Sequence, residues 1–258
     1  MVNNADMNLS VFSGYITGFL FILLRTSIFV ALLPVIGGRQ LPMQFRIGFA
    51  VFIAILLTPV VRFQISENDV AMLVLKEVFV GIALGFSVRL IFYAVNMAGL
   101  FISYAMGLAM GIVYNPEMGQ STYIAEIYGI MTMMFFLVTN AHHDLIYVFV
   151  KSFELLPGGR ANMTALVPLV MSMMSKLFVI ALKISAPVLV GLLISNILSG
   201  FLYKVAPQLN IFFITLPLNI FLGFLLMTVS IPVFEYVLGI NFANLRGEMA
   251  RIIMMAKG

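Results

Sequence analysis

The chain has no cysteine and no tryptophan, and its two histidines, His142 and His143, are adjacent. The absence of cysteine excludes a disulfide framework and thiolate chemistry. Neighbouring side chains on a helix do not face the same way, so the two histidines are poorly placed to bind the same metal ion. We therefore expect no metal and no cofactor, and we assign the pair an interfacial role or a contact with a partner. The pair lies in a polar interruption, residues 140–144, between predicted helices at 123–139 and 145–155.

Charge is also scarce in this chain. Only 9% of the 258 residues are charged, whereas 62% are hydrophobic. Soluble globular domains carry about 25% charged residues. The apolar runs are continuous, without the alternating polarity of membrane strands, and several reach the roughly 20 residues that an α-helix needs to cross a bilayer. The fold class that we predict is an all-α integral membrane protein.

The basic residues form no continuous patch. The net charge is +4, but Lys and Arg are scattered between apolar runs, which fits a membrane orientation signal and argues against nucleic acid as a partner. The sequence contains no nucleotide-binding loop, nucleophile–base set or metal cluster, so we expect no enzymatic activity. The first ten residues contain no Lys or Arg, so the run from Val11 is expected to remain as the first helix.

One segment breaks the apolar pattern. Residues 97–123 start as an apolar run, which we expect to loosen at Gly99, Gly107 and Gly111 and to break at the pair Asn115-Pro116. Glycine weakens a helix and the residue before a proline avoids helical geometry, so we expect the run to unwind into a short polar loop. Irregular backbone in so apolar a chain requires shelter by protein or by a water-filled cavity. The alternative is that Gly107 and Gly111, four residues apart, only mark helix packing.

Two of the apolar runs contain charges. Arg25 lies inside the first predicted helix, about Val11 to Leu33, where an unpaired charge costs roughly 2.5–3.5 kcal/mol. The next long helix carries four residues spaced four apart: Glu77, Gly81, Gly85 and Arg89. This spacing places them on one helix face, either as a groove for a partner helix or as a packing seam with a functionally silent charged rim.

The last third of the chain predicts a helical hairpin. Two long apolar helices, at about 165–201 and 211–238, flank a polar turn. The turn contains Pro207, Gln208 and Asn210. We expect three prolines to bend the arms, because proline removes a helical hydrogen bond. They are Pro187, Pro217 and Pro232.

Basic residues mark two further surfaces of this region. Lys176 and Lys183 are seven residues apart and therefore share one face of the first arm. The tail, residues 241–258, is amphipathic and carries Arg246, Arg251 and Lys257. We expect this tail to lie at a cytoplasmic membrane surface.

Taken together, these landmarks resemble the FliR family, the R subunit of the flagellar type III protein export gate, which is related to the T subunit of virulence secretion systems. The most specific match is the turn APQLNIF of residues 206–212, and the next is the run AG-x-x-IS-x-x-MG of residues 98–107. Further matches include Arg25, Pro116 with Gly119, the histidine pair and Pro157. Two positions depart from the family pattern, with Ala105 where Gln is expected and Asn115 where Asp is commoner.

The resemblance implies an architecture and a set of partners. One R subunit joins several P and Q subunits in a helical cone, much of which is held above the membrane plane. Residues 1–160 would be similar to a P subunit, the hairpin 165–240 would be similar to a Q subunit, and 241–258 would be the basic tail. The partners would be the P and Q subunits, the membrane switch protein of the export apparatus and unfolded flagellar substrates. The location would be the bacterial inner membrane, within the flagellar basal body.

The resemblance also implies a function, that of a channel-forming component of the export gate whose loop 106–123 closes the pore. Glycines allow a loop to approach a pore axis, and methionines adapt to irregular surfaces. The plug residues would be Met106, Gly107, Met110, Gly111, Asn115, Pro116, Glu117, Met118 and Gly119. The residues for subunit packing or charge pairing would be Arg25, Glu77, Gly81, Gly85, Arg89, Lys176 and Lys183.

Two alternatives remain open at this point. A secondary transporter or proton-conducting subunit would use Glu77, Glu126 and Glu235 as intramembrane relay groups, although no inverted repeat is evident in the sequence. A purely structural scaffold would differ from a pore component because changes in its loop would affect assembly but not ion leak.

Overall fold

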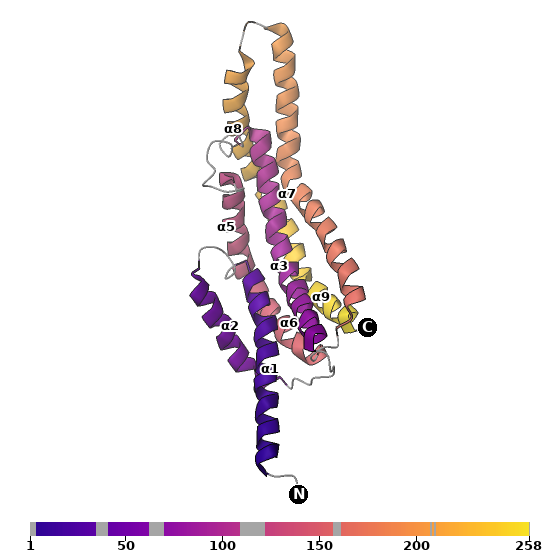
Figure 1. Cartoon of the computed structure of the whole chain (residues 1–258). Helices are drawn as coiled ribbons and strands as arrows, with labels where there is room; N and C mark the ends of the chain where they lie inside the picture. Colours follow the sequence, from indigo (N-terminus) through magenta and orange to yellow (C-terminus); the bar gives the residue numbers. More distant parts are fainter. Residues whose placement is uncertain are drawn as a thin grey trace. The chain divides into compact units, whose positions relative to one another are not determined.

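The computed structural model describes residues 4–34, 41–61, 70–108, 122–156, 161–206, 208 and 210–257. These residues form eight helices, and no strand occurs among them (Figure 1). The predicted all-α fold is therefore confirmed. The helices are α1 (Asn4–Leu32), α2 (Met43–Leu57), α3 (Val70–Met106), α5 (Tyr123–Val138), α6 (Ala141–Leu155), α7 (Met163–Val205), α8 (Ile211–Val229) and α9 (Ile231–Lys257).

Several helices can cross a bilayer by length and composition. Among the described residues, three segments meet this condition alone: Tyr15–Leu32, Val70–Met106 and Val170–Val205. The number rises to five if the broken pairs α5–α6 and α8–α9 each form one span. The helices thus agree with the integral membrane class that the composition indicates.

The chain divides into two compact units. Unit 1 contains residues 1–89, 140–173 and 244–258, and unit 2 contains residues 90–139 and 174–243. Helices α3, α7 and α9 contribute residues to both units. Each unit is described separately below.

Unit 1 is built on contacts of α1 with its neighbours. The ring of Phe29 on α1 stacks on Phe149 of α6 with centroids 4.0 Å apart, and Phe149 meets Phe153 edge to face at 5.3 Å. Helix α2 lies beside α1 (Figure 1) and buries its small residues Ala50 and Ala54, which allow a close approach. Most of the large apolar residues of α2 remain exposed.

The core of unit 2 is aromatic. Phe92 of α3, Phe136 of α5 and Phe242 of α9 form a triangle with centroid separations of 5.7, 6.2 and 5.4 Å. Tyr128 adds an edge-to-face contact with Phe234 at 5.1 Å. Such pairs add about 0.5–1.5 kcal/mol beyond their buried area, and they join α5 to α3 and α9 within this unit.

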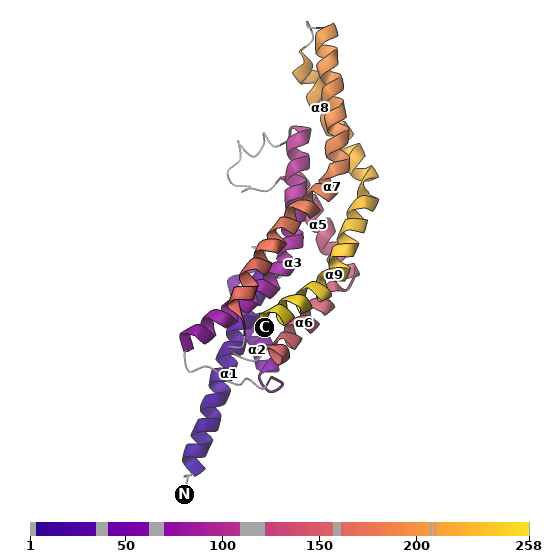
Figure 2. The same cartoon turned by 90° about the vertical axis from the view of Figure 1, so that its right-hand side faces the viewer.

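The predicted hairpin is formed by residues 174–205 of α7 together with α8. Its arms lie side by side in both views (Figures 1 and 2) and are bonded through Ser195, whose hydroxyl donates to Asn219 Oδ1 at 2.9 Å. Asn219 Nδ2 donates in turn to Asn196 Oδ1 at 2.8 Å. Gln208 and Asn210 are exposed in the connecting turn, and Pro207 lies outside the described residues.

Two element boundaries differ from the prediction. The second arm ends at Val229 instead of Leu238, and after a turn at Ser230 one continuous helix, α9, includes the predicted tail. Pro232 explains the position of this break, because proline is tolerated in the first turn of a helix but not in its interior. The predicted polar interruption 140–144 is also mostly helical, since α6 begins at Ala141 after Asn140 with φ 55°.

Candidate functional site

Among the described residues of unit 1, Arg25 and Glu77 are the most deeply buried charges. Each of the two side chains is 1% exposed. The two form a bidentate ion pair, with Arg25 Nε 2.6 Å from Glu77 Oε2 and Nη2 2.9 Å from Oε1. This fork-to-fork geometry gives the strongest type of side-chain hydrogen bond.

Arg25 also bonds to the end of α6. Its Nη1 donates to Ser152 Oγ at 3.1 Å, and Nη2 donates to the carbonyl oxygen of Leu156 at 3.0 Å. The guanidinium carbon lies 4.3 Å from the ring centroid of Phe153. The last carbonyls of a helix lack helical partners, so the contact with Leu156 also completes the end of α6. One guanidinium therefore ties α1, α3 and α6 together, and the pair is electrically neutral.

The glycine-containing face of α3 lies against α1. A Cβ on Gly81 would come within 3.2 Å of the Arg25 carbonyl oxygen and Ile28, and a Cβ on Gly85 would come within 2.7 Å of Leu32 Cβ. Arg89 Nη1 donates to the carbonyl oxygen of Ala31 at 3.1 Å. The partner helix of the predicted groove is thus α1 of the same chain, and the seam runs from Glu77 to Arg89.

In unit 2, the two ends of the segment 107–121 meet. The hydroxyl of Ser103 on α3 donates to Thr122 Oγ1 at 2.7 Å, and Thr122 Oγ1 accepts the backbone N–H of Ala125, capping α5. Helix α3 ends at Met106, and Gly107 adopts φ +79°, which suits a residue without Cβ. We name the group Ser103, Met106, Gly107 and Thr122 the loop neck.

The loop neck also contacts α8. Met106 is fully buried, and its side chain covers Gly223 so closely that a Cβ there would lie 2.6 Å from Met106 Cγ, Sδ and Cε. A Cβ on Gly107 would lie 2.7 Å from Leu216 Cδ1. Leu216 and Gly223 are seven residues apart and share one face of α8, so the end of α3 rests on two turns of α8.

The remaining predicted residues fall into two groups. Lys176 and Lys183 are exposed on the unit 2 part of α7. The other predicted plug residues lie outside the described residues: Met110, Gly111, Asn115, Pro116, Glu117, Met118 and Gly119. Gly99, which the sequence suggested would loosen the helix, lies inside α3 and packs against Ala125, whose N and Cβ would be 2.8 and 2.9 Å from an added Cβ.

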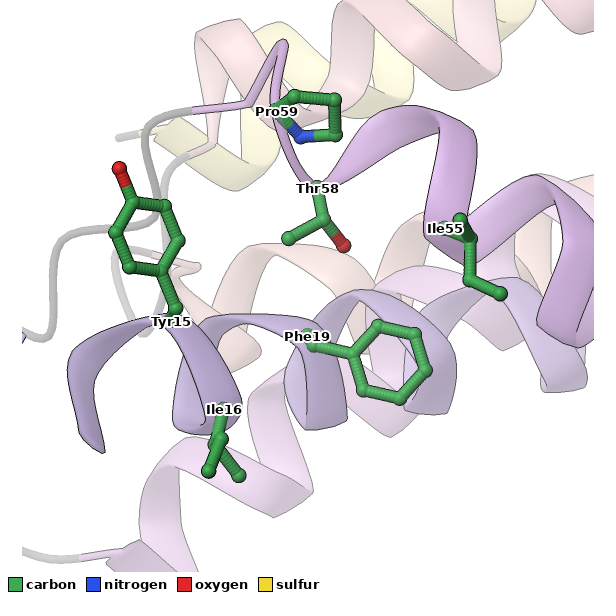
Figure 3. A pocket seen from close by; sticks show the side chains of 6 residues that line it. All are labelled: Tyr15, Ile16, Phe19, Ile55, Thr58 and Pro59. Atoms are coloured by element: carbon green, nitrogen blue, oxygen red, sulfur yellow. The ribbon is translucent and has the colours of Figure 1, made fainter. Parts of the chain in front are cut away.

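Two of the pockets in the described part of the chain are lined mainly by apolar side chains. A shallow groove of about 360 Å³ lies between α1 and the end of α2 (Figure 3), lined by Tyr15, Ile16, Phe19, Ile55, Thr58 and Pro59. A smaller one of about 210 Å³ in unit 2 is lined by Ile127, Tyr128, Met131, Phe224, Met227, Thr228, Ile231 and Phe234. Neither lining contains Asp, Glu, His, Lys or Arg, so neither brings together an acid and a base.

The histidines do not assemble a metal site either. The rings of His142 and His143 are 4.2 Å apart, and the described residues contain no cluster of three or more possible ligands from His, Cys, Asp or Glu. His143 is exposed and His142 half-buried at the start of α6.

The uncharged polar residues that bond between helices were not identified from the sequence. Ser152, Ser103 with Thr122, and Ser195 with Asn219 are buried polar residues that make the bonds described above. An isolated Ser, Thr or Asn inside an apolar helix is a usable signal, because such side chains often bond across helices. The sequence does not state which helix supplies the partner.

These features define the class of protein: an all-helical membrane protein whose buried polar groups join helices to one another. The sequence model of the family described as "Bacterial export proteins, family 1" matches residues 16–245. The chain belongs to this family.

Relatives place the chain in a secretion apparatus. The flagellar biosynthetic protein FliR of Bacillus subtilis is 31% identical over 93% of this chain and 95% of the relative, and FliR of Escherichia coli is 31% identical over 81% and 82%. The secretion system apparatus protein SsaT of Salmonella typhimurium is 26% identical over 62% and 63%. The chain is therefore a membrane component of a flagellar export apparatus that acts in a complex.

Proposed function

We propose that the chain is a channel-forming subunit of the flagellar type III export gate in the bacterial inner membrane, within the flagellar basal body. It would help to pass unfolded flagellar proteins out of the cytoplasm, in a hetero-oligomer with P and Q subunits and next to the membrane switch protein. Residues 1–160 would take the place of a P-like part, residues 165–240 that of a Q-like hairpin, and residues 241–258 that of a basic tail.

The exposed apolar surface supports assembly with other membrane subunits. The two arms of the hairpin expose large side chains on both α7 and α8, including Leu193, Ile197, Phe201, Phe213, Phe221 and Phe224. A chain that worked alone would present this surface only to lipid, whereas a subunit presents part of it to neighbouring helices. Exposed Lys176 and Lys183 are less costly if they face a partner or water than if they face lipid.

The observation that carries the pore role is the loop neck. Because Ser103 bonds to Thr122, the 18 residues between them, 104–121, leave and return at one point of unit 2. This bond fixes both ends of the loop to the same place on the helices of unit 2, which is the anchoring that a pore plug requires. Glycines give this segment access to conformations that other residues avoid, and methionines fit irregular surfaces.

The plug role predicts an ion leak. Residues 109–121 would be replaced by a Gly/Ser linker of equal length, which leaves the loop neck intact, and the passive ion leak of assembled gates would be measured. The same replacement of residues 62–67, between α2 and α3, is the matched control. We expect the leak to rise only for the first variant, and an unchanged leak in gates that still assemble would remove the plug role.

The same measurement separates the scaffold alternative, in which the loop replacement alters assembly and leaves the leak of assembled gates unchanged. The proton-conducting alternative is weakened by Glu77, because both of its carboxylate oxygens are bonded to Arg25 and a relay step would have to break that pair. Glu126 and Glu235 are exposed residues of unit 2. Neutralising all three and finding a loss of export-coupled proton flow, with the gate assembled, would favour this alternative.

A further inference from the structure

The loop neck joins three helices of unit 2 and has a role beyond that of connecting segments. The inference below rests on the proposed plug role of residues 109–121. The loop neck consists of described residues at the end of α3 and the start of α5, and it packs against the face of α8 that contains Leu216 and Gly223.

The bond between Ser103 and Thr122 is costly to open. Ser103 is fully buried and Thr122 is 6% exposed, so separation would leave two hydroxyl groups without water in an apolar surrounding. Thr122 Oγ1 also accepts the N–H of Ala125, so a displaced Thr122 would leave the first turn of α5 uncapped. Gly99 and Ala125 hold the same two helices in close contact one turn earlier on α3.

Gly223 leaves space on α8 in which the Met106 side chain, at the first end of the loop, packs. The Met106 side chain occupies the space that a Cβ at this position would take, and Met106 is fully buried there. Leu216, on the same face of α8, closes over Gly107. The position of α8 therefore sets where the chain leaves α3.

We propose that Ser103, Thr122 and Gly223 are positioning residues that keep the two ends of the loop joined to each other and seated on α8 throughout export. The neck stays closed when substrate passes. Helix α8 is then the element that determines where the two ends of the loop are held.

The first test uses the natural absence of cysteine. The two hydroxyl oxygens are 2.7 Å apart, so Ser103→Cys with Thr122→Cys places two thiols within reach of a disulfide. Assembled gates would be oxidised and then reduced, with disulfide formation followed by thiol labelling and with export and leak measured in both states. The single variants Ser103→Cys and Thr122→Cys are the controls for oxidation itself.

We expect the disulfide to form in assembled gates and to leave both export and leak equal to those of the reduced protein. A loss of export on oxidation that reductant restores would mean that the neck must open, and it would overturn the proposal. Failure of the disulfide to form would also overturn it, because the two side chains would then not be neighbours in the working gate.

The second test fills the space at Gly223 that the Met106 side chain occupies. Gly223→Val pushes the Met106 side chain away, whereas Gly200→Val adds the same side chain to α7 at a site with no atom within 4 Å of a Cβ. We expect Gly223→Val to raise the leak of assembled gates and Gly200→Val to leave it unchanged. Adding Met106→Ala to Gly223→Val restores space for the valine and should return the leak toward the starting value. Equal leak for the two valine variants would contradict a positioning role.

The two proposals fail in different ways. If the loop is no plug but the neck is fixed, the loop replacement leaves the leak unchanged while the oxidised cysteine pair still exports. If the loop is the plug but the neck opens, the loop replacement raises the leak and oxidation blocks export.

Discussion

The two units of the chain are both helical and apolar, and both contain glycines packed against a neighbouring helix, but the buried polar groups that join their helices differ. In unit 1 a buried, bidentate ion pair between Arg25 and Glu77 joins α1 to α3 and, through Ser152 and Leu156, reaches α6. In unit 2 the helix contacts described above use neutral groups: a hydroxyl pair at the loop neck, the Ser195–Asn219 bond in the hairpin, and the glycines Gly99 and Gly223, which are covered by Ala125 and Met106.

This difference separates two ways of specifying helix contacts without relying on the hydrophobic effect, which is weak between helices in lipid. A buried ion pair is directional and all-or-none, because losing either partner strands a charge. Substitutions at packed glycines and at hydroxyl hydrogen bonds cause smaller losses of stability, because an added methyl or a lost hydroxyl leaves no unpaired charge. We therefore expect single substitutions at the ion pair to destabilise unit 1 strongly. In unit 2 we expect smaller losses of stability at several positions.

The largest effect is expected at Arg25. Arg25→Met should lower the free energy of unfolding by about 3–5 kcal/mol, because it leaves the Glu77 carboxylate buried without its cation. The measurement is denaturant or thermal unfolding of the purified protein in detergent, followed by helical circular dichroism.

The double variant Arg25→Met with Glu77→Met is the matched control for this prediction. It removes both charges and keeps apolar volume, so it should recover much of the stability that the single variant loses. If the double variant is as unstable as Arg25→Met, the bonds of Arg25 to Ser152 and Leu156 would outweigh the ion pair.

The second effect tests the close helix contacts of unit 2. Gly99→Ala should cost about 1–3 kcal/mol, because the new methyl meets backbone and Cβ atoms of Ala125 that cannot turn away. Gly129→Ala, in α5 at a site with no atom within 4 Å of a Cβ, should instead stabilise by about 0.5–1 kcal/mol. Effects of opposite sign for the two variants in the same unfolding assay would show that the cost at Gly99 comes from packing and not from helix propensity.

The apolar runs and their spacing predict most of this fold. They give the all-α class, the start of α5 at Tyr123, the hairpin turn and the shared face of Glu77, Gly81, Gly85 and Arg89. They predict other boundaries less well. Glycine costs only about 1 kcal/mol in a helix, and the packing of Gly99 against Ala125 outweighs this cost, so α3 remains helical there. The second arm does bend by 52° next to Pro232, as predicted, but this bend ends α8 at Val229, whereas the predicted arm continued to Leu238.

The candidate site was less predictable, for a physical reason. Arg25 requires a partner for its charge, and the sequence states that need without stating which of ten acidic residues meets it. The answer depends on which helices pack together, a tertiary property. Ser103 and Thr122 lie 19 positions apart, and only the return of the chain at α5 makes them neighbours.

The third effect concerns the polar pair inside the hairpin. Asn219→Leu keeps the approximate volume of the side chain and removes both hydrogen bonds of its amide group. The buried Ser195 hydroxyl is then left without its acceptor. We expect a loss of about 1 kcal/mol, which is typical of a single hydrogen bond between membrane helices. Ser195→Ala combined with Asn219→Leu should cost no more than Asn219→Leu alone, and a larger loss would assign Ser195 a second role.

The smallest effect should come from a second ion pair in unit 1, between Asp144 and Arg246. Its atoms are 3.6 Å apart, the two side chains are 41% and 54% exposed, and Arg246 also lies over the ring of Tyr147 with its guanidinium carbon 4.4 Å from the centroid. Water screens such a pair, so Asp144→Asn should cost less than about 1 kcal/mol, and the cost should vanish in high salt. Salt should leave the penalty of Arg25→Met nearly unchanged, because that charge is shielded from ions by burial. A salt-dependent Arg25 penalty would mean that water reaches the pair, and the sharp contrast between the two units would then disappear.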